Sequence, residues 1–385
     1  MLYIKNGYIK TMAGPDIENG AILIDDNGKI AAVGADIPCP EGAQVIDAEG
    51  RLVTPGCVDA HCHIGLDNQG MGWEGRDYNE IVDPITPQMR AIDSINPMDE
   101  AFGLGLQGGV TTVCTGPGSA NVVGGTFVAM KLAGKRVDNM IVKEPLAMKC
   151  AFGENPKRCY GQGSKKAPMT RMGTAALLRE LLFKTRRYME DKEAGKNPGF
   201  DFKLESMIPV LKGELPLKAH AHRADDILTS IRIAKEFGVK LTLDHCTDGA
   251  LIADELAKEG YPAFVGPTPF GRKSKVELSN KSLETVSILH NAGVKVSIIT
   301  DSPVITQENL PLCAAMAVTA GLDEEVAWQA ITINPATSLG IGDRVGSLEV
   351  GKDADIIIWT TDPLTTVGGH AYIAIIDGKV VYSEA

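Results

Sequence analysis

Short apolar runs at both ends of the chain predict strands joined by tight turns. Near the amino terminus, hydrophobic residues alternate with polar ones around Asn6-Gly7 and Asn27-Gly28, a pattern typical of β-hairpins. The carboxyl-terminal residues repeat this pattern around Asp377-Gly378. Because neither set has enough strands to be stable alone, we predict that residues 1–54 and 346–385 pack together as one small β-sandwich.

Between residues 55 and 345 the pattern changes to helices alternating with strands. A periodic helical run over 224–237 ends at Gly238 and is followed by a β-branched run, and a second helical run over 282–291 ends near Gly293 in the same way. This order is typical of βα units and implies a parallel sheet. We therefore predict an α/β protein in which a (β/α)8 TIM barrel, residues 55–345, is inserted in the β-sandwich.

Composition and charge argue against nucleic-acid binding and against a place in the membrane. The 385 residues are 44% hydrophobic and carry a net charge of −11 without a basic stripe, which argues against a nucleic-acid partner. No apolar run reaches the length of a membrane span, and the amino terminus lacks the pattern of a signal peptide. The eight cysteines form no C-x-x-C pair, and several lie in apolar runs, as reduced thiols do. We expect a cytoplasmic protein without membrane contact.

The most informative motif follows Pro55-Gly56, where a short strand ends in His61-Cys62-His63. Side chains two residues apart on a strand point to the same face, so both imidazoles can reach one point while Cys62 faces away. Two neutral imidazoles suit zinc or a similar metal. Because a single His-x-His is a short motif, this interpretation depends on similar residues at other strand ends.

Three later strand ends carry matching side chains. His220 and His222 again share a face, His245 follows the run 241–244, and Asp301 ends the apolar strand before Pro303. A carboxylate at that position is costly unless it is paired or bound to a metal. These positions predict one site at the mouth of the barrel.

An earlier strand offers two candidates for a further ligand. Glu154 lies at a strand-to-loop boundary, where the other candidates also fall, and we favour it. Lys149 lies inside the run; it is either a core residue or a carboxylated lysine that bridges two metals. The sequence leaves this choice open.

Taken together, these motifs resemble the amidohydrolase superfamily, and within it the imidazolonepropionase-related group. The matching residues are Pro55-Gly56-x-Val58-Asp59-Ala60-His61-x-His63, His220, His245, Asp301, Asn334-Pro335-Ala336-Thr337 and Gly346-Ser347-Leu348-x-x-Gly351-Lys352-Asp353-Ala354-Asp355. The resemblance implies a barrel with one or two divalent metals, zinc first and manganese or iron as alternatives. It also implies that His61, His63, His220 and His245 are metal ligands, and that Asp301 binds metal or the attacking water and carries protons. Glu154 falls where amino-sugar deacetylases of the superfamily place a glutamate ligand.

The resemblance implies a small-molecule substrate and hydrolysis of a carbon–nitrogen bond other than a peptide bond, in a cyclic amide. The sequence departs from imidazolonepropionases in placing Ala221-His222-Arg223 where they carry an acidic pair. We expect His222 to stabilise the oxyanion, and Arg158 and Arg223 to bind an acidic group of the substrate. The alternatives are a dipeptidase that cleaves a linear amide and an inactive scaffold. A homo-oligomer is compatible with the sequence.

Overall fold

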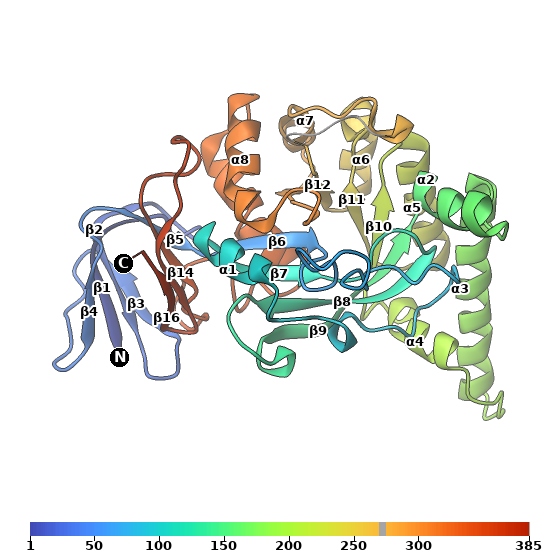
Figure 1. Ribbon diagram of the computed structural model, residues 1–385, viewed down its shortest axis with the longest axis horizontal. Coiled ribbons are helices and arrows are strands. Elements are labelled where there is room, and N and C mark those ends of the chain that lie inside the picture. Colours follow the sequence, from blue (N-terminus) through green and yellow to red (C-terminus); the bar gives the residue numbers. More distant parts are fainter. Residues whose placement is uncertain (269–274, 385) are drawn as a thin grey trace.

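The computed structural model describes residues 1–268 and 275–384, and within them the strands form two sheets of eight strands each. One sheet is built from both ends of the chain and lies at the left of Figure 1; the other forms the barrel to its right. None of the helices in the described part of the chain is long and apolar enough to cross a membrane.

The terminal sheet joins the two ends of the chain through β5 and β14, which pair antiparallel. Its strands are β1 (Leu2–Ile9), β2 (Ile17–Ile24), β3 (Ile30–Gly34), β4 (Gln44–Asp47), β5 (Leu52–Pro55), β14 (Ile356–Trp359), β15 (Ala371–Ile376) and β16 (Lys379–Ser383). The first half of β1 pairs with β4 and its second half with β5. The eight strands are thus linked in one branched sheet, in place of the two separate sheets that the predicted sandwich implies.

The barrel sheet follows the order of the sequence from β6 to β13. Its strands are β6 (Cys57–Cys62), β7 (Val110–Thr115), β8 (Val123–Lys131), β9 (Ile141–Ala151), β10 (Leu217–Ala221), β11 (Leu241–His245), β12 (Ala263–Val265) and β13 (Val296–Ile298). Two backbone hydrogen bonds close it, from Asp301 N to His61 O (3.1 Å) and from His63 N to Ser302 O (2.7 Å). The last segment of the barrel therefore lies beside the first histidine motif.

One strand departs from the predicted (β/α)8 pattern. β8 runs antiparallel to both of its neighbours, β7 and β9, whereas the other pairs in the barrel sheet are parallel. The connections on either side of β8 are short and carry no α-helix. A parallel crossover needs a dozen or more residues, so these short connections permit only antiparallel neighbours.

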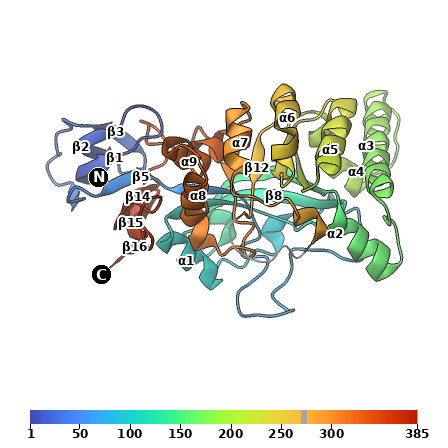
Figure 2. The ribbon, with the colours of Figure 1, turned by 90° about the horizontal axis from the view of Figure 1, so that it is seen from above.

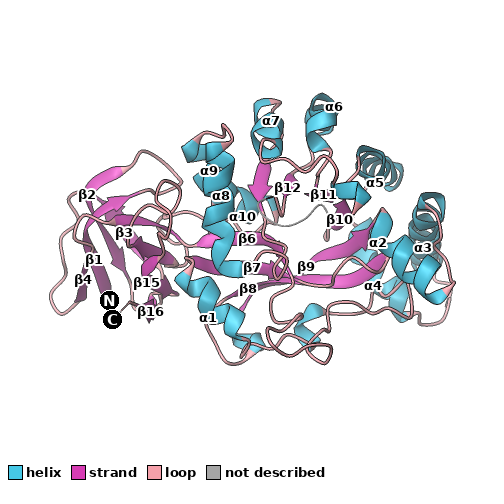
Figure 3. Cartoon of the chain, turned by 45° about the horizontal axis from the view of Figure 1, so that its top comes forward, coloured by secondary structure: helices cyan, strands magenta, loops and turns pink. Residues whose placement is uncertain are grey.

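Most of the helices lie along one side of the barrel sheet when the molecule is seen from above (Figure 2), and Figure 3 shows helices and strands in a tilted view. The α-helices are α1 (Glu100–Gln107), α2 (Glu154–Pro156), α3 (Arg171–Glu193), α4 (Phe202–Leu211), α5 (Ala224–Phe237), α6 (Ala253–Glu259), α7 (Thr285–Asn291), α8 (Leu310–Thr319), α9 (Glu324–Ala330) and α10 (Ile333–Ser338). The helix predicted over 224–237 matches α5, which ends at Gly238 in a left-handed conformation that glycine adopts at little cost.

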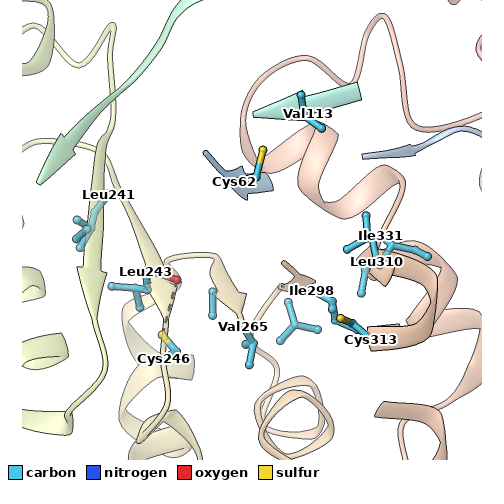
Figure 4. Close-up of a cluster of buried hydrophobic side chains, with 14 of the residues drawn as sticks. Cys62, Val113, Leu241, Leu243, Cys246, Val265, Ile298, Leu310, Cys313 and Ile331 are labelled. Atoms are coloured by element: carbon cyan, nitrogen blue, oxygen red, sulfur yellow. Dashed lines mark hydrogen bonds between the residues drawn. The ribbon is translucent and has the colours of Figure 1, made fainter. Parts of the chain in front are cut away.

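The outward side chains of the barrel strands form the main apolar core beneath these helices. Figure 4 shows Leu243 of β11, Val265 of β12 and Ile298 of β13 in one cluster with Cys313 of α8. Because side chains alternate along a strand, the residues between these positions point into the barrel. On β10, Leu217 and Ala219 belong to the outer core, which leaves Lys218 and His220 on the inner face.

Candidate metal centre and active site

The structure brings the predicted histidines and Asp301 together at one end of the barrel. They form two groups, in each of which the possible ligand atoms lie within 4.8 Å of one another. The first group is His61, His63 and Asp301, and the second is His220, His222 and His245. The residues of each group come from strand ends that are neighbours in the closed barrel, or from the segment that closes it.

In the first group, two imidazoles face one carboxylate. Asp301 Oδ1 lies 3.4 Å from His61 Nε2 and 3.2 Å from His63 Nε2. The other ring nitrogens are occupied, since His61 Nδ1 donates to Asp244 Oδ2 (2.6 Å) and His63 Nδ1 to Gly116 O (2.7 Å). These partners fix each ring so that Nε2 points to the centre, the usual arrangement of metal-binding histidines.

The second group is a closely packed set of three imidazoles. The ring centroid of His220 lies 4.7 Å from that of His222 and 4.4 Å from that of His245. His245 Nδ1 donates to Gly266 O (2.7 Å), and His222 Nδ1 lies 2.8 Å from Thr247 Oγ1. His220 Nδ1 and His245 Nε2 are buried without a hydrogen-bond partner among the described residues.

Burial controls protonation in both groups. Burial lowers the pKa of His61, His220, His222 and His245, so these rings are neutral near pH 7 and keep a lone pair for a ligand bond. Burial opposes ionisation of Asp301, but the imidazoles beside it outweigh this effect and hold the pKa of its carboxyl well below the usual range. Neutral imidazoles with unpartnered nitrogens, together with a carboxylate, are a donor set that fits a divalent metal of the zinc, manganese or iron type.

The backbone at two of the ligand positions is strained. His245 has φ 75° and Asp301 has φ 54°, and Cys246, next to His245, has φ 47°. Residues other than glycine rarely adopt positive φ, and such conformations concentrate at functional sites, each at a cost of about 1–3 kcal/mol. Here they turn the chain at the end of β11, where His245 lies, and after β13, where Asp301 lies.

A network of buried charged side chains adjoins the first group. Lys149 Nζ lies 3.2 Å from His61 Nε2, and Lys218 Nζ lies 3.0 Å from Asp244 Oδ2. All four side chains are fully buried. Burial lowers the pKa of Lys149 to about 8, whereas Lys218 and His61 overcome burial at Asp244 and hold the pKa of its carboxyl below the usual range.

Glu154 belongs to neither group of possible ligands. It begins α2 half-buried, and its backbone N–H donates to Glu277 Oε2 (2.9 Å). Lys149, the alternative weighed from the sequence, is the candidate on β9 that reaches a histidine of the site. The sequence signal for Lys149 was its position on an apolar strand, where an ordinary lysine is rarely buried.

A cavity of about 620 Å³ opens over the two groups. Arg158 lines it, is exposed, and has no hydrogen bond or ion pair with any residue in 1–268 or 275–384. Arg223 is not among the lining residues; its guanidinium donates to both carboxylate oxygens of Asp225, at 3.0 and 2.9 Å. The walls also carry groups that the sequence did not single out, among them Asp67, Tyr78 and Lys275.

Comparison with known proteins agrees with this geometry. The crystal structure of an amidohydrolase from Thermotoga maritima MSB8 is 41% identical in sequence, covers both chains completely and superposes with a TM-score of 0.96. This chain belongs to the amidohydrolase superfamily. The model of the amidohydrolase family matches residues 211–381 of this amidohydrolase.

Two curated relatives extend the comparison. Amidohydrolase tasK of Hapsidospora irregularis is 30% identical over 95% of this chain, which spans 40% of the length of tasK. The imidazolonepropionase of Rhizobium rhizogenes is 25% identical over 94% of this chain and 91% of its own. The predicted membership, including imidazolonepropionase-related members, is confirmed, and the protein is a hydrolase that acts on carbon–nitrogen bonds.

Proposed function

We propose that this amidohydrolase is metal-dependent and cleaves an amide bond in a small molecule that carries an acidic group. The observation that carries the proposal is the pair of ligand groups, in which neutral imidazoles and Asp301 meet beneath a cavity lined by Arg158. One or two divalent ions fit these donors, with zinc as the first candidate and manganese or iron as alternatives.

The ligands divide between the two groups. His61, His63 and Asp301 would hold one ion, and His220 and His245 would contribute to a second. We assign Lys149 rather than Glu154 as the remaining ligand, because the Lys149 amine already lies beside His61 Nε2. A neutral amine can bond to carbon dioxide and release a proton, which converts it into a carboxylate ligand. The pKa of about 8 at Lys149 makes the neutral amine accessible near pH 7.

When bound, a divalent metal lowers the pKa of a coordinated water and polarises the amide carbonyl. Asp301 is held as a carboxylate, so it accepts a proton from the attacking water and returns it to the leaving nitrogen. His222 lines the cavity with its ring fixed by Thr247, and it stabilises the developing oxyanion through Nε2. Arg158 binds the acidic group of the substrate.

We place cyclic amides first among the substrates, because imidazolonepropionases are full-length relatives of this chain. A linear amide is the second candidate, and the opposite charges of Arg158 and Asp67 on the cavity walls favour it. An inactive scaffold is the least favoured function, since the histidines and Asp301 are all present and converge.

The cysteines of the described chain are free, as expected for a cytoplasmic protein.

A screen for hydrolysis tests the proposal. Purified protein, with its metal content measured by elemental analysis, is incubated with imidazolones, hydantoins and N-acyl amino acids. We expect one or two metal equivalents, and hydrolysis of at least one class that stops after chelation and returns when metal is added. Failure of the metal-loaded protein to hydrolyse any of these amides would contradict the proposed function.

A further inference from the structure

The cavity carries opposite charges on segments that follow different strands of the barrel. Arg158 and Lys275 come from the segments after β9 and β12, whereas Asp67 comes from the segment after β6. In the closed sheet, β6 is next to β7 and β13, and β9 and β12 lie further round the barrel. A substrate that spans the mouth therefore meets an anionic wall at one end and a cationic wall at the other.

The anionic wall is a built structure next to the first ligand group. The Asp67 backbone N–H donates to His63 O (3.0 Å), and the ring centroid of Tyr78 lies 5.3 Å from that of His63. Both side chains line the cavity. An ammonium group in this corner would meet a carboxylate and an aromatic side chain, two partners that cations prefer in proteins.

The surrounding loop holds these side chains in place. Asp77 N donates to Leu66 O (2.7 Å), which closes the turn that carries Asp67. Gly118 N donates to Tyr78 O (2.6 Å), and a Cβ at Gly118 would lie only 2.5 Å from the Tyr78 ring, so a glycine is needed there. The corner is thus fixed in the protein before a ligand binds, which reduces the entropy lost on binding.

Among the described residues, Asp67 forms one ion pair, with Arg76, whose Nε lies 3.5 Å from Oδ1. The Arg76 side chain is 61% exposed, whereas that of Asp67 is 15% exposed. An exposed ion pair of this kind is weak, so it leaves Asp67 available to a ligand cation inside the cavity.

We propose that Asp67 and Tyr78 form a subsite for an ammonium group, and that the substrate is a small zwitterionic amide with its amino group beside the scissile carbonyl. The inference rests on the proposed function and develops its second substrate candidate, the linear amide, which the charges of the cavity favour. Because the subsite adjoins His63, the amino group belongs to the acyl part of the substrate. The carboxylate then belongs to the leaving part and lies toward Arg158 and Lys275. This arrangement describes an aminoacyl amino acid.

Neighbouring side chains hold Lys275 in place at the cationic wall of the cavity, where the substrate carboxylate would bind. Its Nζ donates to Asn155 Oδ1 (2.6 Å), and Asn155 Nδ2 donates in turn to Ser119 Oγ (2.8 Å). Glu277 Oε1 lies 3.6 Å from Lys275 Nζ and offsets part of its charge. Arg158, without a partner among the described residues, supplies the remaining positive charge.

The test compares dipeptides with their N-acetyl counterparts. We expect the parent enzyme to prefer the free amine by roughly 10- to 100-fold in kcat/KM, the range of a charged hydrogen bond. Asp67→Asn should abolish this preference, while the control Asp77→Asn, an exposed carboxylate on the same loop, should keep it. Tyr78→Phe should keep the preference and Tyr78→Leu reduce it. Equal rates on both substrate forms, or an unchanged preference in Asp67→Asn, would overturn the subsite.

A binding experiment separates this inference from the proposed function. Calorimetry with L-leucinamide and N-acetyl-L-leucinamide measures recognition of the amine whatever the turnover. Tighter binding of the free amine, lost in Asp67→Asn, supports the subsite even if no amide in the screen is cleaved. Equal binding of both probes overturns it even if hydrolysis of other amides is found.

Discussion

His61 Nδ1 lies 2.6 Å from Asp244 Oδ2, and neither side chain is exposed to solvent. The same carboxylate oxygen lies 3.0 Å from Lys218 Nζ. Asp244 therefore orients a metal-ligand candidate and at the same time neutralises a buried lysine. A carboxylate that fixes the tautomer of a histidine also increases the basicity of its other nitrogen, which strengthens metal binding.

Replacing this carboxylate tests its double role. We predict that Asp244→Asn weakens metal binding by about 10- to 100-fold, because the His61 ring loses its charged partner. We also predict a loss of stability of about 3–5 kcal/mol, because the substitution leaves Lys218 as an uncompensated buried charge. Competition with a chelator measures the first effect, and urea unfolding of the metal-free protein measures the second.

The double variant Asp244→Asn/Lys218→Met is the matched control. Removing the lysine as well should recover much of the stability without recovering metal affinity. If the double variant is no more stable than Asp244→Asn, the charge of Lys218 is not what makes the single variant unstable.

A second prediction decides between the two ligand candidates at the end of β9. We predict that Lys149→Met lowers the metal content of the purified protein, whereas Glu154→Gln leaves it unchanged. We expect this difference because Lys149 Nζ lies 3.2 Å from His61 Nε2, whereas Glu154 is in neither ligand group. Elemental analysis of the two variants gives the result. The reverse pattern, with metal lost only in Glu154→Gln, would restore Glu154 as the ligand.

Carboxylation of Lys149 has its own signature. With ¹³C-labelled bicarbonate, the parent protein should show a carbamate carbon resonance that is missing in Lys149→Met. A parent spectrum without this resonance would mean that Lys149 contributes to the site as an amine.

The histidines were predictable because local spacing alone places them. On β6 and β10, residues two apart share a face, so the spacing of His61/His63 and of His220/His222 is enough to pair them. The residues that support them were harder to predict. Asp244 precedes His245 directly, and its contact with Lys218 depends on the register between β10 and β11, which the sequence does not encode locally.

Side-chain direction past a strand end was not predictable either. Arg158 and Arg223 both follow strand ends, yet Arg158 lines the cavity and Arg223 pairs with Asp225. The fold shows the same limit at β8, whose antiparallel direction departs from the predicted parallel (β/α)8 barrel. The lengths of the adjoining connections determined that β8 runs antiparallel.

The third prediction concerns proton transfer. Asp301→Asn should keep the fold and most of the metal but reduce kcat by about 10²- to 10⁴-fold on any substrate found in the screen. The amide is similar in size and can still coordinate through oxygen, but it cannot accept the proton. Steady-state kinetics and elemental analysis are measured on the same preparation. A variant with full metal content and the parent rate would exclude Asp301 as the proton carrier.

The last prediction concerns Lys131, which ties the barrel to the terminal sheet. Its Nζ lies 2.7 Å from Asp353 Oδ2 and 3.0 Å from Asp355 Oδ1, and all three side chains are buried. It also pairs with Asp377 in the turn before β16. Removing the lysine leaves the buried Asp355 carboxylate without a cation among the described residues, while Asp353 keeps its ion pairs with Lys29 and Arg344. Lys131→Met should therefore cost about 3–5 kcal/mol at pH 7 in urea unfolding.

The stability difference between the parent and Lys131→Met depends on pH through the carboxyl groups that Lys131 contacts. Burial raises the pKa of Asp355 to about 6, so its carboxyl takes up a proton as the pH falls toward 4, and the charge that Lys131 must neutralise decreases. The stability difference between parent and Lys131→Met should therefore shrink between pH 7 and pH 4. Asp353 titrates at lower pH, because Lys131, Lys29 and Arg344 together outweigh burial and hold the pKa of its carboxyl at about 2, below the usual 3.8. Its contribution to the parent should be lost as the pH falls from about 4 to about 2.

The exposed pair Arg136–Asp138 in the connection between β8 and β9 supplies the control for Lys131→Met. Its side chains are 74% and 68% exposed, so Arg136→Gln should change stability by no more than about 0.5 kcal/mol at either pH. If Lys131→Met is as stable as this control at pH 7, or if its deficit grows on acidification, the buried carboxylates do not depend on the charge of Lys131.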